Sequence, residues 1–167
     1  MQRAALWSAA DGGAPSQAMR IRGRVLDRGG RPLAGAWVEV WHADANGRYR
    51  HPSQPDAVQV DAAFHGHGAV STGPDGAWCF DSVMPGTYFD GASKRAPHVH
   101  FQVTHGDNRL VTQMFFPGQG LNDSDRWYCA VRDPARLLPR PLAARGACLV
   151  FCWDIVIGST HAPGETP

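Results

Sequence analysis

The sequence has no long run of apolar residues. The stretch from Met1 to Met19 mixes alanines with Gly-Gly and a proline, and it contains no apolar core of the length that a signal peptide or a membrane helix requires. We therefore expect a cytoplasmic protein without a membrane partner.

Neither sign of charge dominates. The chain has 16 Lys and Arg against 15 Asp and Glu, a formal net charge of +1, and the two signs are mixed along the sequence. Binding of nucleic acid usually requires a basic patch or stripe, which is missing here. We therefore expect no nucleic-acid partner. The expected partners are small molecules and further copies of the chain, in a homo-oligomer.

Cysteine is scarce, and no pair has the C-x-x-C spacing of zinc or redox sites. The four cysteines are Cys79, Cys129, Cys148 and Cys152. A chain of 167 residues buries about two-thirds of its unfolded surface and does not need disulfides to fold. We predict one domain over residues 1–167, with 1–18 and 158–167 as peripheral arms, and reduced, mostly buried cysteines.

Glycine and proline, in contrast, are frequent. The 19 glycines and 13 prolines divide short segments rich in Val, Ile, Phe and Trp, a pattern typical of an all-β sandwich or barrel with long loops and little helix. A short helical turn is expected at 122–127. Strands are expected at 20–27 and 36–41, at 68–72 and 77–80 as one hairpin, at 96–104 and 109–116 as another, and at 148–157.

The histidine strand carries the most informative side chains. His98 and His100 are two residues apart, so both rings project from the same face of a strand, and the hairpin partner brings Gln113 toward them. Alone, such a pair is more often part of a polar, solvated strand face than a metal site. A second pair, His65 and His67, is flanked by glycines, a poor setting for rigid ligands.

Two tyrosines change the interpretation of the histidine pair. Tyr49 and Tyr88 would add two phenols to the two imidazoles. Imidazole suits several metals, whereas phenolate oxygen is a hard donor that favours a highly charged cation such as ferric iron. A phenol ionises near pH ~10, so the charge of the metal must lower its pKa for binding at neutral pH. A tyrosine that only packs its ring is the ordinary alternative.

Four sequence blocks resemble one family. The chain is similar to the intradiol ring-cleaving dioxygenases of the protocatechuate 3,4-dioxygenase type, most of all to the iron-bearing β subunit, over about residues 19–157. The first block is shared with many transthyretin-like binding modules, whereas the ordered Tyr, Tyr, His-x-His set is much more specific. The blocks are Gly23-Arg24-Val25-Leu26-Asp27 with Gly30-Arg31-Pro32-Leu33-Ala34-Gly35-Ala36, residues 38–51 around Tyr49, Pro85-Gly86-Thr87-Tyr88, and Arg95-Ala96-Pro97-His98-Val99-His100-Phe101.

The resemblance implies a transthyretin- or immunoglobulin-like β-sandwich with one non-haem ferric ion. The implied ligands are Tyr49, Tyr88, His98 and His100. The substrate would be a small aromatic diol, a protocatechuate-like catechol, which chelates the iron as a dianion. It would displace the axial ligand Tyr88, which accepts a proton. Dioxygen would then cleave the ring between the two hydroxylated carbons to give a cis,cis-muconate. Arg95 would stabilise carbanion character, and Gln113 matches a glutamine beside the site.

The chain also departs from that family. It has no counterpart to the helical N-terminal domain of catechol and hydroxyquinol 1,2-dioxygenases. Phe89-Asp90-Gly91 replaces the Pro-Trp that follows the second tyrosine in protocatechuate enzymes. A substrate carboxylate would need a cationic or hydrogen-bonding partner, for which Arg48, Arg50 and His51 are candidates.

Several alternatives remain open from the sequence. They are an intradiol enzyme for hydroxyquinol or a substituted catechol, an iron-free transthyretin-like binding module, and an extradiol dioxygenase with ferrous iron on two histidines and a carboxylate. The oligomeric state and the need for a separate α-type subunit also stay open.

Overall fold

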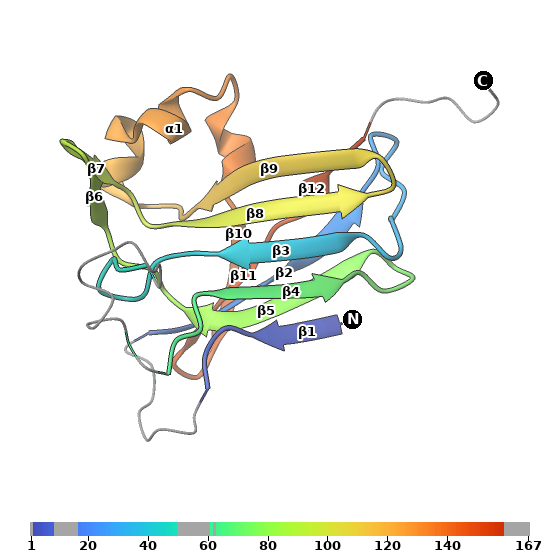
Figure 1. The fold of residues 1–167 in the computed structure, drawn as a ribbon, viewed down its shortest axis with the longest axis horizontal. Helices are drawn as coiled ribbons and strands as arrows, with labels where there is room; N and C mark the ends of the chain where they lie inside the picture. Colours follow the sequence, from blue (N-terminus) through green and yellow to red (C-terminus); the bar gives the residue numbers. More distant parts are fainter. Residues whose placement is uncertain (1, 9–16, 50–60, 62, 159–167) are drawn as a thin grey trace.

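The chain folds as two stacked β-sheets (Figure 1). The computed structural model describes residues 2–8, 17–49, 61 and 63–158. One sheet has the order β1-β5-β2-β11-β10, with β12 also paired to β2, and the other has the order β4-β3-β8-β9. The strands of the first sheet are β1 (Gln2–Ala5), β2 (Ala18–Leu26), β5 (Ala77–Val83), β10 (Arg140–Arg145), β11 (Cys148–Cys152) and β12 (Ile155–Val156). Those of the second are β3 (Trp37–Trp41), β4 (His67–Ser71), β8 (His98–His105) and β9 (Asn108–Phe115).

The main core fills the space between the two sheets. In β8, Val99, Phe101 and Val103 are fully buried and face this core. Phe101 contacts Trp78 and Trp153, with ring centroids 5.4 and 5.1 Å apart. Because strand side chains alternate between faces, the residues between these three project from the outer face of the sheet. The all-β sandwich predicted from the sequence is confirmed.

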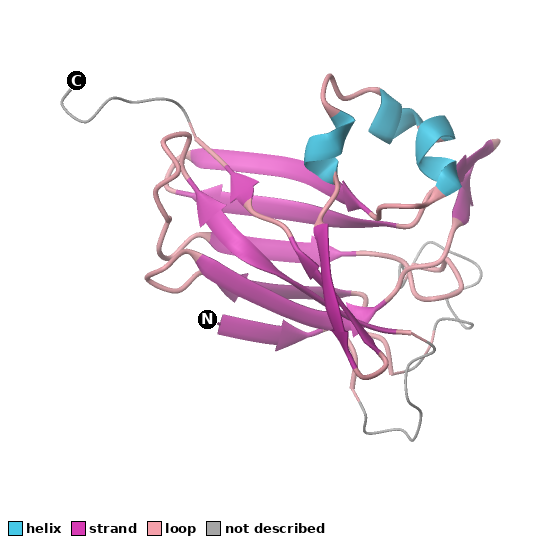
Figure 2. Ribbon diagram, turned by 180° about the vertical axis from the view of Figure 1, so that it is seen from behind, coloured by secondary structure: helices cyan, strands magenta, loops and turns pink. Residues whose placement is uncertain are grey.

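A short ribbon and a helical segment lie at one end of the sandwich. The ribbon consists of β6 (Tyr88–Asp90) and β7 (Ser93–Arg95), and beside it lie η3 (Gly120–Ser124), α1 (Arg126–Cys129) and η4 (Pro134–Leu137) (Figures 1 and 2). The helical turn predicted at 122–127 is confirmed. A small second core of Ala96, Phe115 and Leu137 anchors this segment to the sheet. Among the described residues, none of the helices is long and apolar enough to cross a membrane.

Two strand predictions are wrong, one in its pairing and the other in its continuity. Strands β4 and β5 do not form a hairpin, because the turn at residues 73–76 takes the chain from one sheet to the other. The segment 148–157 is not one strand. It is interrupted at Trp153 and Asp154, where the carbonyl of Trp153 lies so close to Gly23 that a Cβ there would be 1.8 Å from its oxygen. The residues of a turn do not by themselves indicate which of the two sheets the next strand joins.

The N-terminal arm contributes a strand that the sequence pattern did not predict. Strand β1 pairs in parallel with β5 at the sheet edge, and Leu6, directly after it, is fully buried in the main core. All four cysteines are free, as expected, but only Cys79 is buried, whereas Cys129 is exposed and the other two are half-buried. The prediction of mostly buried cysteines is therefore wrong.

Candidate metal centre

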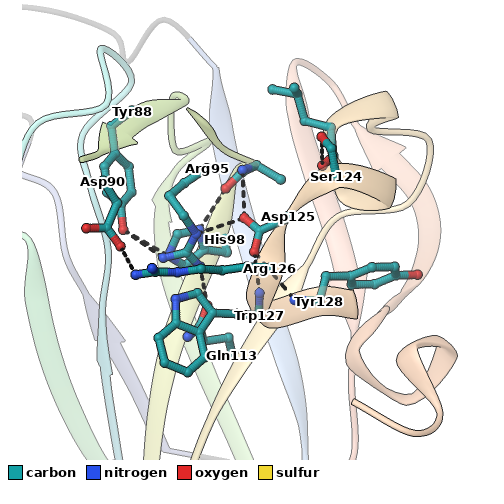
Figure 3. Close-up of polar contacts among 12 residues, drawn as sticks. Tyr88, Asp90, Arg95, His98, Gln113, Ser124, Asp125, Arg126, Trp127 and Tyr128 are labelled. Carbon is teal, nitrogen blue, oxygen red and sulfur yellow. Dashed lines mark hydrogen bonds and ion pairs between the residues drawn. The ribbon is translucent and has the colours of Figure 1, made fainter. Parts of the chain in front are cut away.

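The four predicted ligands lie together at the end of the outer sheet face. The Nε2 atoms of His98 and His100 are 3.2 Å apart, and the Tyr88 hydroxyl is 3.4 Å from His98 Nε2. The ring of Tyr49 meets that of Tyr88 edge to face, with centroids 5.3 Å apart, and lies 6.3 Å from that of His100. Figure 3 shows Tyr88 and His98 pointing toward each other, with Arg95 beside them.

Strand register explains this convergence. Tyr88 pairs with Arg95 across the β6–β7 ribbon, and β8 begins at His98, three residues later. His100 pairs with Gln113 on β9 and with Trp41 on β3. The indole of Trp41 stacks on the His100 ring, 5.0 Å away and nearly parallel. The hairpin therefore brings Gln113 to the histidines, as predicted, and Trp41 supports His100 from the other neighbouring strand.

A tight turn holds Tyr49 against the segment that leads to Tyr88. The Asp44 carboxylate accepts hydrogen bonds from the amides of Asn46 and Arg48, both at 2.9 Å. The Gly86 amide donates to the Asp44 carbonyl at 2.9 Å. Gly47 has a φ of +79°, and a Cβ there would lie 2.0 Å from the Thr87 carbonyl oxygen. Two backbones meet here without space for a side chain, which fixes the distance between the two tyrosine segments.

The histidine geometry favours metal binding. His98 Nδ1 lies 2.7 Å from the carbonyl oxygen of Ala96, which only accepts, so in the neutral ring Nδ1 carries the proton and Nε2 carries the lone pair that can bind a metal. Two donors bound to one metal at about 2.1 Å are roughly 3.0–3.4 Å apart when the angle between them is 90–110°. The 3.2 and 3.4 Å distances from His98 Nε2 to His100 and Tyr88 fall in this interval.

Burial sets the charge states of these donors. Burial lowers the pKa of His98 to about 4 and, together with the neighbouring His98, that of His100 to about 3. Both rings are therefore neutral ligands at neutral pH. Burial and the adjacent Tyr88 raise the pKa of Tyr49, whose buried hydroxyl has no hydrogen-bond partner in the described structure. A nearby cation would satisfy this oxygen and reverse the shift.

The donor set also distinguishes between kinds of metal site. Among the described residues, no three or more His, Cys, Asp and Glu side chains are grouped as a metal site. A centre of two histidines and a carboxylate therefore has no support in the described structure. The two imidazoles and two phenols fit a hard, highly charged cation instead.

Arg95 is buried beside the tyrosine. Its side chain is 3% exposed, and each of its three nitrogens donates one hydrogen bond. Nη1 donates to the Tyr88 hydroxyl at 3.2 Å, Nη2 to Gln113 Oε1 at 2.7 Å, and Nε to Asp125 Oδ2 at 2.8 Å (Figure 3). The sequence pointed to Arg95 and Gln113 but missed Asp125. The only local signal for this residue is that it precedes a helical turn, where aspartate is a common cap.

A cavity of about 370 Å³ adjoins this group on the β9 side. Its polar lining comes from His100, Thr112 and Gln113, and the rest is apolar: Val111, Phe115, Trp127, Val131 and Leu137. Small-molecule sites are usually apolar pockets with a few fixed polar groups. A larger cavity of about 830 Å³, along the outer edge of β9, includes none of the four predicted ligands. The smaller cavity is therefore the candidate substrate site.

The remaining sequence candidates have other roles or positions. His65 and His67 are exposed. His42 is buried and lies within hydrogen-bonding distance of the Ala43 carbonyl and the Ser82 hydroxyl, so its role is in packing. Of the candidate partners for a substrate carboxylate, Arg48 is half-buried, and Arg50 and His51 lie outside the described residues.

The Phe89-Asp90 segment lies at the outer end of the ribbon. Phe89 is 70% exposed, and Asp90 forms an ion pair of 2.6 Å with Arg126 on α1 (Figure 3). This pair connects the β6–β7 ribbon to the helical segment, whose Trp127 lines the cavity. Both partners are partly exposed, so the pair stabilises this connection only weakly.

Comparisons with known proteins point to dioxygenases. A family model described as "Dioxygenase" matches residues 2–159. The protocatechuate 3,4-dioxygenase beta chain of Burkholderia cepacia is 37% identical over 153 residues, which cover 85% of this chain and 65% of that protein. The hydroxyquinol 1,2-dioxygenase of Nocardioides simplex is 35% identical over 68% of this chain and 42% of its own length. The chain thus spans less than two thirds of both relatives.

A solved structure gives a similar result. The dioxygenase domain of a dioxygenase and carbohydrate-binding protein fusion from Streptomyces sp. SirexAA-E superimposes with a TM-score of 0.71 and 26% identity. The superposition covers 91% of this chain and 84% of that one. Most of the chain therefore has the fold of a dioxygenase domain.

The two site histidines predict a pH dependence of the metal-free protein. Their folded pKa values of about 4 and about 3 lie below the unfolded value of ~6.5. Between these values the unfolded chain binds more protons, so the free energy of unfolding should fall as the pH decreases from about 6.5 toward 4. Urea unfolding at several pH values measures this. His100→Gln should reduce the slope, whereas His67→Gln, at an exposed position, should leave it unchanged. A slope unaffected by His100→Gln would contradict this account.

Gly47 provides a test of the backbone contact between the tyrosine segments. Gly47→Ala should destabilise the fold and weaken metal binding, because the new Cβ collides with the Thr87 carbonyl. Gly30→Ala is the matched control, since Gly30 has a φ of +80° and open space around it. The control should cost only the left-handed backbone penalty of about 1–2 kcal/mol. Urea unfolding and metal titration compare the two variants, and equal effects would contradict the proposed contact.

Proposed function

Because this chain belongs to the intradiol dioxygenase family, we propose that it is a non-haem ferric enzyme that opens the ring of a catechol with dioxygen between the two hydroxylated carbons. The product would be a cis,cis-muconate. The observation that carries this proposal is the convergence of two imidazoles and two phenols beside a buried arginine.

Tyr49, Tyr88, His98 and His100 would hold the metal. The fit rests on the unprotonated Nε2 of His98, the neutral state of both rings and the unpartnered hydroxyl of Tyr49. Ferric iron would supply the Lewis acidity that binds both catechol oxygens and makes the ring electron-rich enough to react with dioxygen. Trp41 and the Ala96 carbonyl would keep the two imidazoles in place.

Tyr88 is the proposed proton acceptor. A catechol that binds through both oxygens must release two protons: the phenolate oxygen of Tyr88 would accept one, and water would accept the other. Arg95 Nη1, 3.2 Å away, would stabilise the phenolate before this transfer and remain bonded to the phenol after it. Tyr88 lies on a short two-stranded ribbon outside the two main sheets, so its displacement need not disturb the core.

Arg95 would also stabilise the reacting ring. Its guanidinium is always charged, and its three hydrogen bonds fix its plane. Negative charge that develops on the catechol during oxygen attack would meet a cation that is already oriented and shielded from water. Gln113 holds one side of this cation and lines the substrate cavity.

Protocatechuate is the first candidate substrate, since one curated relative is named for its cleavage. Of the candidate partners for its carboxylate, Arg48, the residue before Tyr49, is the one that lies within the described residues. The apolar cavity also suits a substituted catechol, and another relative is named for hydroxyquinol. A homo-oligomer remains a prediction.

Removal of the Tyr88 hydroxyl tests the enzyme proposal. The ferric protein should be red to brown through charge transfer from tyrosinate to iron. Tyr88→Phe should weaken and shift this absorption and lower turnover by at least about 10²-fold, the usual contribution of a general base. Tyr128→Phe, the same change at a tyrosine that packs on Phe115 and is not one of the four proposed ligands, should alter neither. A parent protein that stays colourless after ferric reconstitution would refute the proposal.

Oxygen uptake tests the substrate assignment. Protocatechuate, catechol, hydroxyquinol and alkylcatechols would be supplied in turn to the ferric protein. We expect the largest kcat/KM for protocatechuate, and Arg48→Gln should reduce it for protocatechuate more than for catechol, because only the former carries a carboxylate. Turnover confined to catechols without a carboxylate would exclude protocatechuate.

A further inference from the structure

Asp125 is a buried charged residue that contacts Arg95. Its side chain is fully buried, and it lies 30 residues after Arg95 in the sequence. Although burial raises its pKa, hydrogen bonds from Arg95 and from the Ala96 and Trp127 amides hold that pKa below the usual value. A buried carboxylate that stays ionised needs this compensation, because an unpaired charge in the interior is costly.

The two carboxylate oxygens of Asp125 serve different parts of the structure. Oδ2 accepts from Arg95 Nε at 2.8 Å and from the Ala96 amide at 3.0 Å. Oδ1 accepts from the Trp127 amide at 3.0 Å and the Tyr128 amide at 3.4 Å, and so caps α1. One oxygen therefore faces the metal site, and the other holds the helical segment that lines the cavity (Figure 3).

The contact at Nε decides where the other two nitrogens of Arg95 point. A guanidinium is planar and rigid. When Nε is held by the carboxylate, the group can rotate only about that hydrogen bond, which restricts the positions of Nη1 and Nη2. Nη1 reaches the Tyr88 hydroxyl and Nη2 reaches Gln113. Without the carboxylate, nothing in the described structure would bind Nε, and the long side chain would regain rotamer freedom.

We propose that Asp125 is a positioning residue that holds the Arg95 guanidinium in the orientation that serves Tyr88 and the bound substrate. This proposal rests on the proposed function. It assigns to Asp125 a role beyond capping α1. Because the same carboxylate holds α1, it also couples the position of the cavity wall to that of the arginine.

The variant Asp125→Asn separates the two roles. An asparagine can keep its oxygen on the α1 amides, but its NH₂ group then faces Arg95 Nε and the Ala96 amide, which are both donors. Asp125→Ser is a second variant, since serine also caps helices but does not reach Arg95 as a carboxylate does. Asp123→Asn is the matched control, because it removes the same charge from an exposed position two residues away.

Kinetics give the first measurement. We expect Asp125→Asn to lower kcat by about 10- to 100-fold, the usual effect of removing a group that orients a residue at a metal site, with KM little changed. The visible absorption of the ferric protein should shift, because the hydrogen bond to Tyr88 is disturbed. Asp123→Asn should match the parent in both. An Asp125→Asn variant that folds and retains the parent kcat would overturn the proposal.

A double variant shows whether Asp125 acts through Arg95. Arg95→Lys removes the planar guanidinium while keeping a cation next to the carboxylate. If Asp125 acts only by orienting Arg95, adding Asp125→Asn to Arg95→Lys should change kcat by no more than about twofold, the range seen when no further interaction is lost. Losses that multiply in the double variant would show that Asp125 supports activity by another route and would overturn the proposal.

Nuclear magnetic resonance of the iron-free protein gives a measurement independent of activity. The Arg95 Nε–H proton, which is hydrogen-bonded to a buried carboxylate, should exchange slowly with solvent and give a separate signal. The loss of this signal in Arg95→Lys would assign it. The signal should broaden or move in Asp125→Asn and Asp125→Ser but not in Asp123→Asn. Fast exchange in the parent would refute the anchoring even if neither Asp125 variant folds. A parent with a protected Nε–H but no turnover of any catechol would refute the proposed function and leave the anchoring in place.

Discussion

The alternation of side chains along β8 is the constraint on which the site depends. Val99, Phe101 and Val103 are fixed in the core between the sheets by large aromatic neighbours, so His98 and His100 must face outward together. A shift by one residue would bury both imidazoles in an apolar core and expose Phe101. Packing of the core thus fixes the register of β8 and with it the positions of the two imidazoles. The neighbouring strands place Trp41 and Gln113 opposite His100.

Segments outside the two main sheets complete the group. Tyr49 follows a turn whose glycine is packed against the backbone before Tyr88, and Arg95 pairs with Tyr88 across the ribbon. Asp125 then connects the ribbon end to the helical segment. The turn contributes Tyr49, the ribbon contributes Tyr88 and Arg95, and the helical segment contributes Asp125, all outside the main core. This arrangement fits the proposed centre, in which Tyr88 would leave while the other three ligands stay.

The sequence predicted what depends on local pattern. Strand periodicity indicated the common face of His98 and His100, and a short turn indicated the hairpin that brings in Gln113. Three features depend on long-range packing and have no local signal: the crossing of β4 and β5 into different sheets, the Asp125 contact with Arg95, and the stacking of Trp41 on His100. Strand Gln2–Ala5 was missed because four residues with little apolar character pair only at a sheet edge.

The central claim is that two tyrosines and two histidines hold one ferric ion. A crystal structure of the iron-loaded protein, with anomalous scattering measured at the iron edge, tests it most directly. We expect one iron bonded to the phenolate oxygens of Tyr49 and Tyr88 and to the Nε2 atoms of His98 and His100, with Arg95 Nη1 still beside Tyr88. Iron bound elsewhere, or bound to the histidines without either tyrosine, would contradict the account.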